Sequence, residues 1–177
     1  MLTEGTIKTP EQITSMREAG DIVARAMINC GEKLQSGVTT GEVDSFLREY
    51  IEKEGAKPAF LGLYGFPATA CISLNEEIVH GIPGKRKLLK GDLVSIDCGA
   101  IVGGMYSDHA RTFTIEDSTD EDKNELISVA DNALRIGIEN SIAGNRIGIL
   151  SNAIEEYVLS KGFDVVREYV GHGIGTQ

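Results

Sequence analysis

The sequence predicts an α+β domain of two similar halves, each a pair of helices followed by strands. Capping signals begin the helices, an apolar hairpin with a Gly-Gly turn follows the first pair, and the chain partly matches itself at a shift of 107 residues. We expect one domain over residues 1–177, with a first half at about 10–115 and an incomplete second half at about 118–177. The alternative is two helical hairpins that resemble each other by chance.

Helix starts are predicted where a Thr or Ser is followed three residues later by Glu or Gln, which is the pattern of a capping box. Thr9, Thr39 and Ser118 carry this pattern, and Pro10 suits the first position of a helix. Glycines follow the periodic apolar positions and mark the helix ends. The helices are expected at about residues 9–34, 39–55, 118–143 and 147–161.

Strands are predicted from short apolar runs between turn residues. The clearest is a hairpin over Leu93–Ile115 that turns at Gly103 and Gly104. Further strands are expected at residues 70–74, near 78–80 and at 165–170.

The composition excludes several classes of protein. The length of 177 residues suits one domain, and 41% apolar residues are enough for a core. A formal net charge of −10 argues against affinity for nucleic acid or anionic membranes. The sequence shows neither a membrane-spanning run nor a signal peptide, and its three widely spaced cysteines suggest reduced thiols. We therefore expect a cytoplasmic protein.

Two aspartates in the predicted hairpin form the sharpest candidate site. A turn at Gly103–Gly104 places Asp97 opposite Ala110, so Asp97 and Asp108 share one face of the sheet on neighbouring strands. Their diagonal separation of about 7–8 Å can bracket two metal ions about 3.5–4 Å apart. Without a cation, two inward carboxylates would repel each other. The alternative is that this face is exposed to solvent.

Histidines supply the other candidate polar groups. His172 lies between glycines after a predicted strand and could ligate a divalent metal. His80 ends an apolar strand before a turn and could donate a hydrogen bond to a substrate oxygen. His109 points to the opposite face from Asp108 and is expected to be a surface or packing residue. A lone histidine is more often a surface or satisfied core residue, so that alternative stays open for His80 and His172.

Taken together, these features resemble the type I methionine aminopeptidases and their pita-bread fold, in the family's order and near its spacings, from about Thr9 onward. The resemblance rests on five stretches of sequence: Pro58–Gly62, Ser73–Pro83, Ser95–Gly99, Tyr106–Phe113 and Gly171–Gly175.

The resemblance implies a role for each candidate residue. Asp97, Asp108 and His172 match metal ligands, and His80 matches the histidine that hydrogen-bonds the scissile peptide. The methionine pocket would be lined by Phe60, Leu63, Phe66 and Cys71, which are otherwise ordinary core residues. The implied cofactors are two divalent ions of cobalt, manganese, iron or zinc, and the implied substrate is the N-terminal methionine of nascent polypeptides.

The resemblance also implies an incomplete site within these residues. The family places two glutamate ligands and a second histidine after the stretch that matches Gly171–Gly175, whereas this sequence ends at Gln177. We therefore expect a partial second half, and an inactive chain is one of the outcomes that stay open.

Two other functions stay open. One is a proline-specific pita-bread aminopeptidase. The other is a non-catalytic member that binds peptides or ribosomes. Transient ribosome contact could use Lys85–Lys87 with Lys90, although a solvated loop is the simpler reading of these charges.

Overall fold

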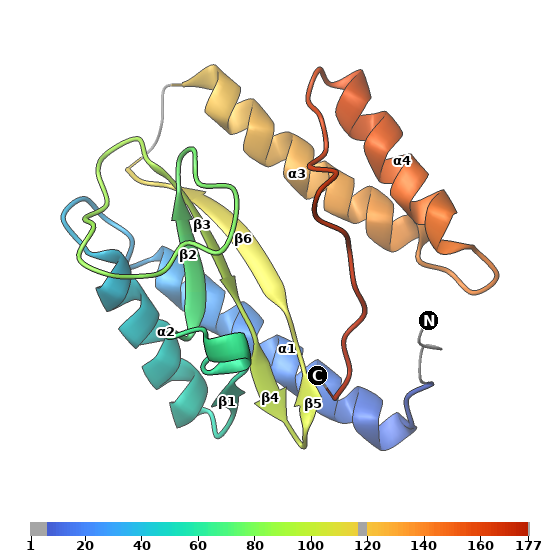
Figure 1. Ribbon diagram of the computed structural model, residues 1–177, viewed down its shortest axis with the longest axis horizontal. Helices are drawn as coiled ribbons and strands as arrows, with labels where there is room; N and C mark the ends of the chain where they lie inside the picture. Colours follow the sequence, from blue (N-terminus) through green and yellow to red (C-terminus); the bar gives the residue numbers. More distant parts are fainter. Residues whose placement is uncertain (1–6, 117–119, 177) are drawn as a thin grey trace. The chain divides into compact units, whose positions relative to one another are not determined.

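Capping boxes begin both helices of the first pair, as predicted. Helix α1 spans Pro10–Gly31 and helix α2 spans Thr40–Lys53. Thr9 and Thr39 each accept a hydrogen bond from the backbone N–H three residues on, and that residue's side chain accepts one in return. The computed structural model describes residues 7–116 and 120–176 (Figure 1). Helix α1 ends three residues before the expected Leu34.

The predicted hairpin is present in the predicted register. Its strands are β3 (Leu93–Cys98), β4 (Ala100–Val102), β5 (Met105–Tyr106) and β6 (His109–Thr114). Gly103 and Gly104 both have positive φ, 56° and 78°, as a tight two-residue hairpin turn requires. Val102 faces Met105 at the turn, and Asp97 faces Ala110 farther along.

The hairpin divides between two three-stranded sheets, a division that was not expected from the sequence. Strands β3 and β6 pair with β2 (Ala70–Leu74) in the order β2-β3-β6, while β4 and β5 join β1 (Lys57–Pro58) in the order β1-β4-β5. The division falls at Gly99 on one arm and at Ser107–Asp108 on the other.

Gly99 and Ser107 produce this division. A side chain at position 99 would overlap the carbonyl oxygen of Ser107, so only glycine fits there. The Ala100 N–H donates to the Ser107 hydroxyl at 3.1 Å, while the Ser107 N–H donates to the Ala100 carbonyl at 2.9 Å. The hydroxyl thus replaces a ladder acceptor, and Asp108 lies outside both strands.

The first of two compact units comprises the described residues 7–116 and 172–176, and its core lies between its helices and strands. Helices α1 and α2 run along the strands (Figure 1), and every residue of β2 is buried. Met27 of α1, Leu47 of α2 and Ile96 of β3 are completely buried in one apolar cluster. Residues 172–176 belong to the same unit, and the Tyr106 N–H donates to the Gly175 carbonyl at 2.8 Å.

A second unit comprises the described residues 120–171. Helix α3 spans Glu121–Asn140, and helix α4 spans Ile147–Ser160. Asp120 caps α3 through its side chain, whereas the expected cap, Ser118, lies outside the described residues. The core of this unit is small and consists of Val129, Ala133 and Val158 with partly buried neighbours.

Two predicted strands are wrong. Residues 78–80 and 165–170 have no strand structure, and Ile78, Val79, Val166 and Val170 are all exposed. Apolar, β-branched residues favour a strand only where a partner strand supplies hydrogen bonds and a surface to pack on. Within 120–171 the structure shows no strand at all.

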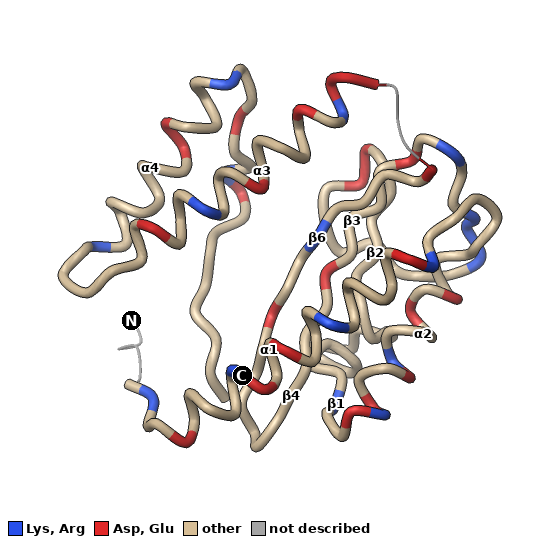
Figure 2. The backbone as a smooth tube through the Cα atoms, turned by 180° about the vertical axis from the view of Figure 1, so that it is seen from behind, with Lys and Arg blue, Asp and Glu red and all other residues tan. Residues whose placement is uncertain are grey.

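No helix among the described residues is long and apolar enough to span a lipid bilayer. Lysine, arginine, aspartate and glutamate are spread along the helices and loops, with a basic stretch in the loop beside α2 (Figure 2).

Candidate active site

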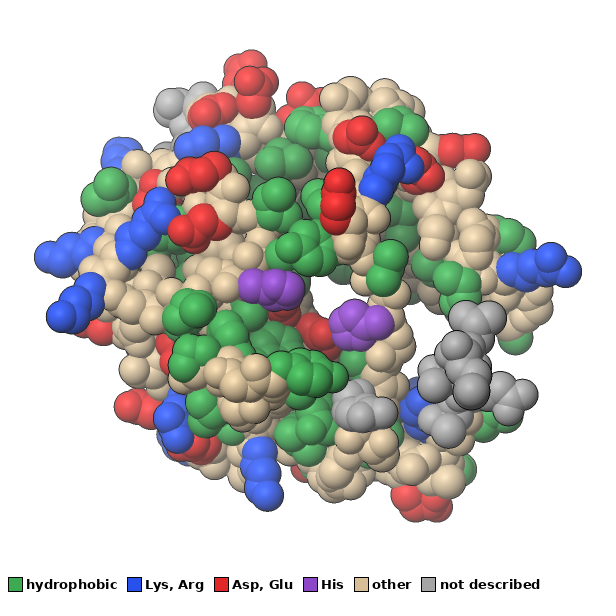
Figure 3. All heavy atoms as spheres, in the orientation of Figure 1, with side chains coloured by type: hydrophobic (Ala, Val, Ile, Leu, Met, Phe, Trp, Pro, Cys, Tyr) green, Lys and Arg blue, Asp and Glu red, His purple; other side chains and the backbone are tan. Residues whose placement is uncertain are grey.

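All eight residues singled out from the sequence line one cavity of the first unit, which has a volume of about 880 Å³. In Figure 3, histidine side chains border a hollow that contains acidic side chains and has a largely apolar rim. Other residues that were not expected from the sequence also line the cavity. Those with a side chain are Tyr64, Pro67, Ile82, Tyr106, Ser107 and Ile174.

The acidic side of the cavity is formed by Asp97 and Asp108. Asp97 projects from β3, while Asp108 lies in the break that Ser107 creates before β6. Burial, followed by the nearby charge of Asp108, raises the pKa of Asp97 from its ordinary 3.8 to about 7. The Asp97 Oδ1 atom is buried and has no hydrogen-bond partner among the described residues. A buried carboxylate oxygen without a partner is suited to a cation.

His172 joins this acidic pair from the C-terminal segment. Its Nε2 atom lies 3.6 Å from the Asp108 Oδ2 atom, and its Nδ1 atom lies 3.1 Å from the Gly173 carbonyl. Across the described ranges, no three histidine, cysteine or carboxylate side chains are close enough together to hold a metal ion. The three residues therefore supply suitable donor types, but they do not form a closed metal cage.

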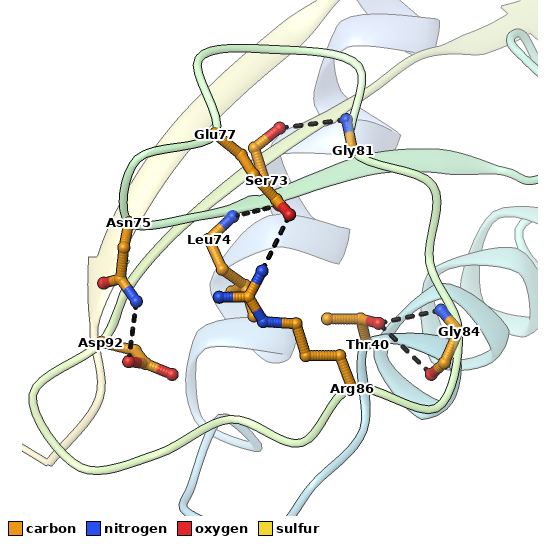
Figure 4. A network of polar contacts seen from close by, with 9 residues as sticks. All are labelled: Thr40, Ser73, Leu74, Asn75, Glu77, Gly81, Gly84, Arg86 and Asp92. Carbon is orange, nitrogen blue, oxygen red and sulfur yellow. Dashed lines mark hydrogen bonds and ion pairs between the residues drawn. The ribbon is translucent and has the colours of Figure 1, made fainter.

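His80 reaches the cavity from the loop of residues 75–92, not from the end of a strand. Its backbone has a φ of 61°, in the left-handed region. The next residue, Gly81, is fastened to β2: the Ile72 N–H donates to its carbonyl at 2.8 Å, and its own N–H donates to the Ser73 hydroxyl at 3.1 Å (Figure 4).

The apolar side of the cavity comes from β2 and from the turns that precede it. Cys71 pairs directly with Asp97 across the β2–β3 ladder, which places its thiol beside the acidic pair. Phe60, Leu63 and Phe66 come from consecutive turns around a short 3₁₀ helix, Leu63–Gly65. Burial, followed by the charge of Asp97, raises the pKa of the Cys71 thiol to about 11, so this thiol is neutral near pH 7.

The other lining residues left little signal in the sequence. Tyr64 is fully exposed and Ile82 is 66% exposed, and nothing in the sequence indicates that either side chain lines a cavity. Tyr106 lies two residues before Asp108, and Ile174 lies two residues after His172, so proximity in sequence was the one available hint. His109, expected to face away, is half-buried on β6 and does not line the cavity.

Comparison with known proteins gives consistent results. Residues 14–177 match the model of metallopeptidase family M24. The methionine aminopeptidase of Clostridium perfringens is 45% identical over 171 residues, covering 97% of this chain and 68% of the relative.

Solved structures agree with this match. The crystal structure of methionine aminopeptidase from Thermotoga maritima superposes with a TM-score of 0.93 at 41% identity, covering 97% of this chain and 69% of that one. Prolidase from Pyrococcus furiosus superposes with a TM-score of 0.85 at 26% identity, over 97% of this chain and 49% of that one. The α+β pita-bread fold expected from the sequence is confirmed, and the chain spans about two thirds of the length of the methionine aminopeptidases it matches.

Proposed function

The chain belongs to metallopeptidase family M24 and to the methionine aminopeptidases within it, and we propose that it removes N-terminal methionine by hydrolysing the first peptide bond. The observation that carries this proposal is a single cavity with an acidic, histidine-bearing side and an apolar side. Such a cavity can bind an apolar side chain while polar groups act on the adjoining peptide bond.

The polar side would hold two divalent ions through Asp97, Asp108 and His172. Carboxylate and imidazole donors suit cobalt, manganese, iron and zinc, and the unpartnered Oδ1 atom of Asp97 is consistent with an added cation. Ions bound there would supply a Lewis acid and an ionised water near neutral pH. A cation held by these side chains would also offset the burial and the neighbouring charge of Asp108, which together raise the pKa of Asp97.

The remaining residues would bind and orient the substrate. Phe60, Leu63 and Phe66 would surround the methionine side chain, and the neutral thiol of Cys71 would contact its polarizable sulfur. His80 would donate a hydrogen bond to the oxygen of the scissile carbonyl, where negative charge develops. The apolar side would exclude water from the methionine side chain.

Metal binding can be tested without relying on activity. We expect added Mn²⁺ or Co²⁺ to raise the melting temperature of the wild-type chain, because a ligand that binds only the folded state stabilises it. Asp97→Asn should abolish this increase. The matched control is Asp131→Asn on α3, which removes an exposed carboxylate far from the cavity in sequence. This variant should show the same metal-dependent increase in melting temperature as the wild-type chain. An equal increase in all three proteins would contradict the proposed ligands.

Activity and specificity require a peptide assay with the same metals. The expected result is release of methionine from Met-Gly-Met, with no release from an Ala-Pro peptide. Cleavage of the Ala-Pro peptide alone would favour a proline-specific enzyme, which the likeness to a prolidase makes a relevant comparison. Peptide binding without cleavage of either substrate would favour a non-catalytic member.

A substrate drawn from nascent chains would place the reaction in the cytoplasm beside ribosomes. The loop that carries Lys85–Lys87 and Lys90 remains the candidate for a transient contact with ribosomes, although Arg86 is already paired with Glu77 at 2.8 Å. Salt-dependent co-sedimentation with ribosomes, lost when Lys85 and Lys87 are both changed to Glu, is the expected result if the loop makes this contact.

A further inference from the structure

The loop of residues 75–92 carries His80 but has no helix or strand of its own, so other elements must hold its shape. His80 itself adopts a backbone conformation that residues other than glycine rarely populate. Such a conformation persists only where surrounding contacts fix it. Figure 4 shows polar contacts along the whole loop, and two of them hold the segment 80–84: Ser73 contacts Gly81, and Thr40 contacts Gly84.

On one side, Ser73 of β2 holds the residue that follows His80. Ser73 is only 3% exposed, and its hydroxyl accepts the Gly81 N–H at 3.1 Å, while the neighbouring Ile72 N–H donates to the Gly81 carbonyl at 2.8 Å. A side chain at position 81 would overlap the Ile72 carbonyl oxygen, so the loop backbone here lies directly against the strand.

On the other side, the first turn of α2 holds Gly84. The Thr40 hydroxyl accepts the Gly84 N–H at 2.8 Å, and the Gly41 N–H donates to the Gly84 carbonyl at 2.9 Å. The Thr40 N–H donates to the Arg86 carbonyl at 2.9 Å. The N–H groups at a helix start have no partner within the helix, so the loop supplies acceptors that α2 needs.

We propose that Ser73 is a positioning residue for His80, with Thr40 as a second, more distant support. Ser73 does not line the cavity, so its hydroxyl acts only through the Gly81 backbone. Loss of that acceptor leaves the partly buried Gly81 N–H unpaired beside His80 and lets the imidazole move relative to Asp97 and Asp108. The consequence for catalysis rests on the proposed function of His80, whereas the change in His80 position does not.

The test compares Ser73→Ala with Ser95→Ala. Ser95 lies directly opposite Ser73 on β3 and on the same face, and its hydroxyl contacts Thr112 at 2.8 Å, not the loop. The chain has three histidines, so their imidazole resonances can be followed individually by NMR. We expect Ser73→Ala to shift or broaden the signals of His80 and leave those of His109 unchanged. Ser95→Ala should change neither.

Kinetics give the second readout. Ser73→Ala should lower kcat for methionine release by about 10- to 100-fold, as expected for a misplaced hydrogen-bond donor, while KM changes by less than about 2-fold. If Ser73→Ala does not fold, Thr40→Val and Thr40→Ser replace it. Valine removes the hydroxyl and should move the His80 signals, while serine keeps the hydroxyl and should restore them.

Unchanged His80 signals in Ser73→Ala, or equal changes in Ser95→Ala, would overturn the proposal. A moved His80 with unchanged kcat would leave the positioning role intact and contradict the catalytic role proposed for His80.

Discussion

Helices α2 and α4 have the same backbone plan in different surroundings. They span residues 40–53 and 147–160, a shift of 107 residues at both ends. The glycine before each has a φ of 94° (Gly37) or 96° (Gly144), and the glycine after each has a φ of 82° (Gly55) or 81° (Gly162). Yet α2 buries four residues completely or nearly so, while α4 buries one.

The difference shows which properties are local and which depend on partners. Helix bounds follow from the glycines and apolar periodicity nearby in the sequence, so they recur at the shift. Burial depends on the strands that pack against α2 in the first unit, and no strand lies among the described residues of the second. Internal resemblance therefore predicts the path of the backbone better than it predicts the energetics of each helix.

The largest expected effect tests this difference in burial. Leu47→Ala in α2 should lower the free energy of unfolding by about 2–5 kcal/mol, because Leu47 is completely buried. Its counterpart in α4, Ile154, is only partly buried, and Ile154→Ala should cost about 1 kcal/mol. Amide hydrogen exchange, measured separately for the two helices, reports both values. Equal costs would mean that α4 has a packing partner comparable to that of α2.

An intermediate effect tests the shared backbone. Gly55→Ala and Gly162→Ala should each cost about 1–2 kcal/mol, because both positions have positive φ. Thermal or urea unfolding measures the two costs. Gly20→Ala is the control: Gly20 lies within α1 with no atom near its missing side chain, so alanine there should stabilise the helix by about 1 kcal/mol. Clearly unequal losses of stability at positions 55 and 162 would show that the backbone after α2 and the backbone after α4 are not equivalent.

The smallest effect concerns the helix starts. Thr39 caps α2 through its side chain, whereas Arg146 in the same position of α4 makes no such bond. Thr39→Ala should therefore destabilise the protein by about 1 kcal/mol, and Arg146→Thr should stabilise α4 by about 0.5–1 kcal/mol. Circular dichroism during unfolding detects both changes. A destabilising Arg146→Thr would indicate that the arginine has a role that capping does not explain.

Features that depend on nearby residues were predictable from the sequence. The hairpin register followed from Gly103–Gly104 and the alternation beside it, and it placed Asp97 opposite Ala110 as observed. The capped starts of α1 and α2 were likewise predictable. The same hairpin register identified Asp97 and Asp108 as candidates. The choice of Phe60, Leu63, Phe66 and Cys71 depended on the family resemblance, because a lone apolar residue has no distinctive pattern.

Features that depend on long-range contacts were not predictable. The division of the hairpin depends on the Ser107 hydroxyl meeting the Ala100 N–H, which no local pattern indicates. Residues 78–80 have the composition of a strand, but the loop that contains them is held by Ser73, Thr40 and Glu77 instead of by a strand ladder. The composition of residues 78–80 gives only a strand propensity, whereas these hydrogen bonds determine that the segment forms a loop.

The tight turn at Gly103–Gly104 constrains how the chain can change during evolution. Because successive residues of a strand point to opposite faces, one inserted or deleted residue at this turn would turn Asp108 away from Asp97. A change of two residues would restore the face but shift the pairing of β3 with β6, so that Ala110 would no longer lie opposite Asp97. Relatives that keep the acidic pair should therefore vary in amino-acid type at this turn far more readily than in its length.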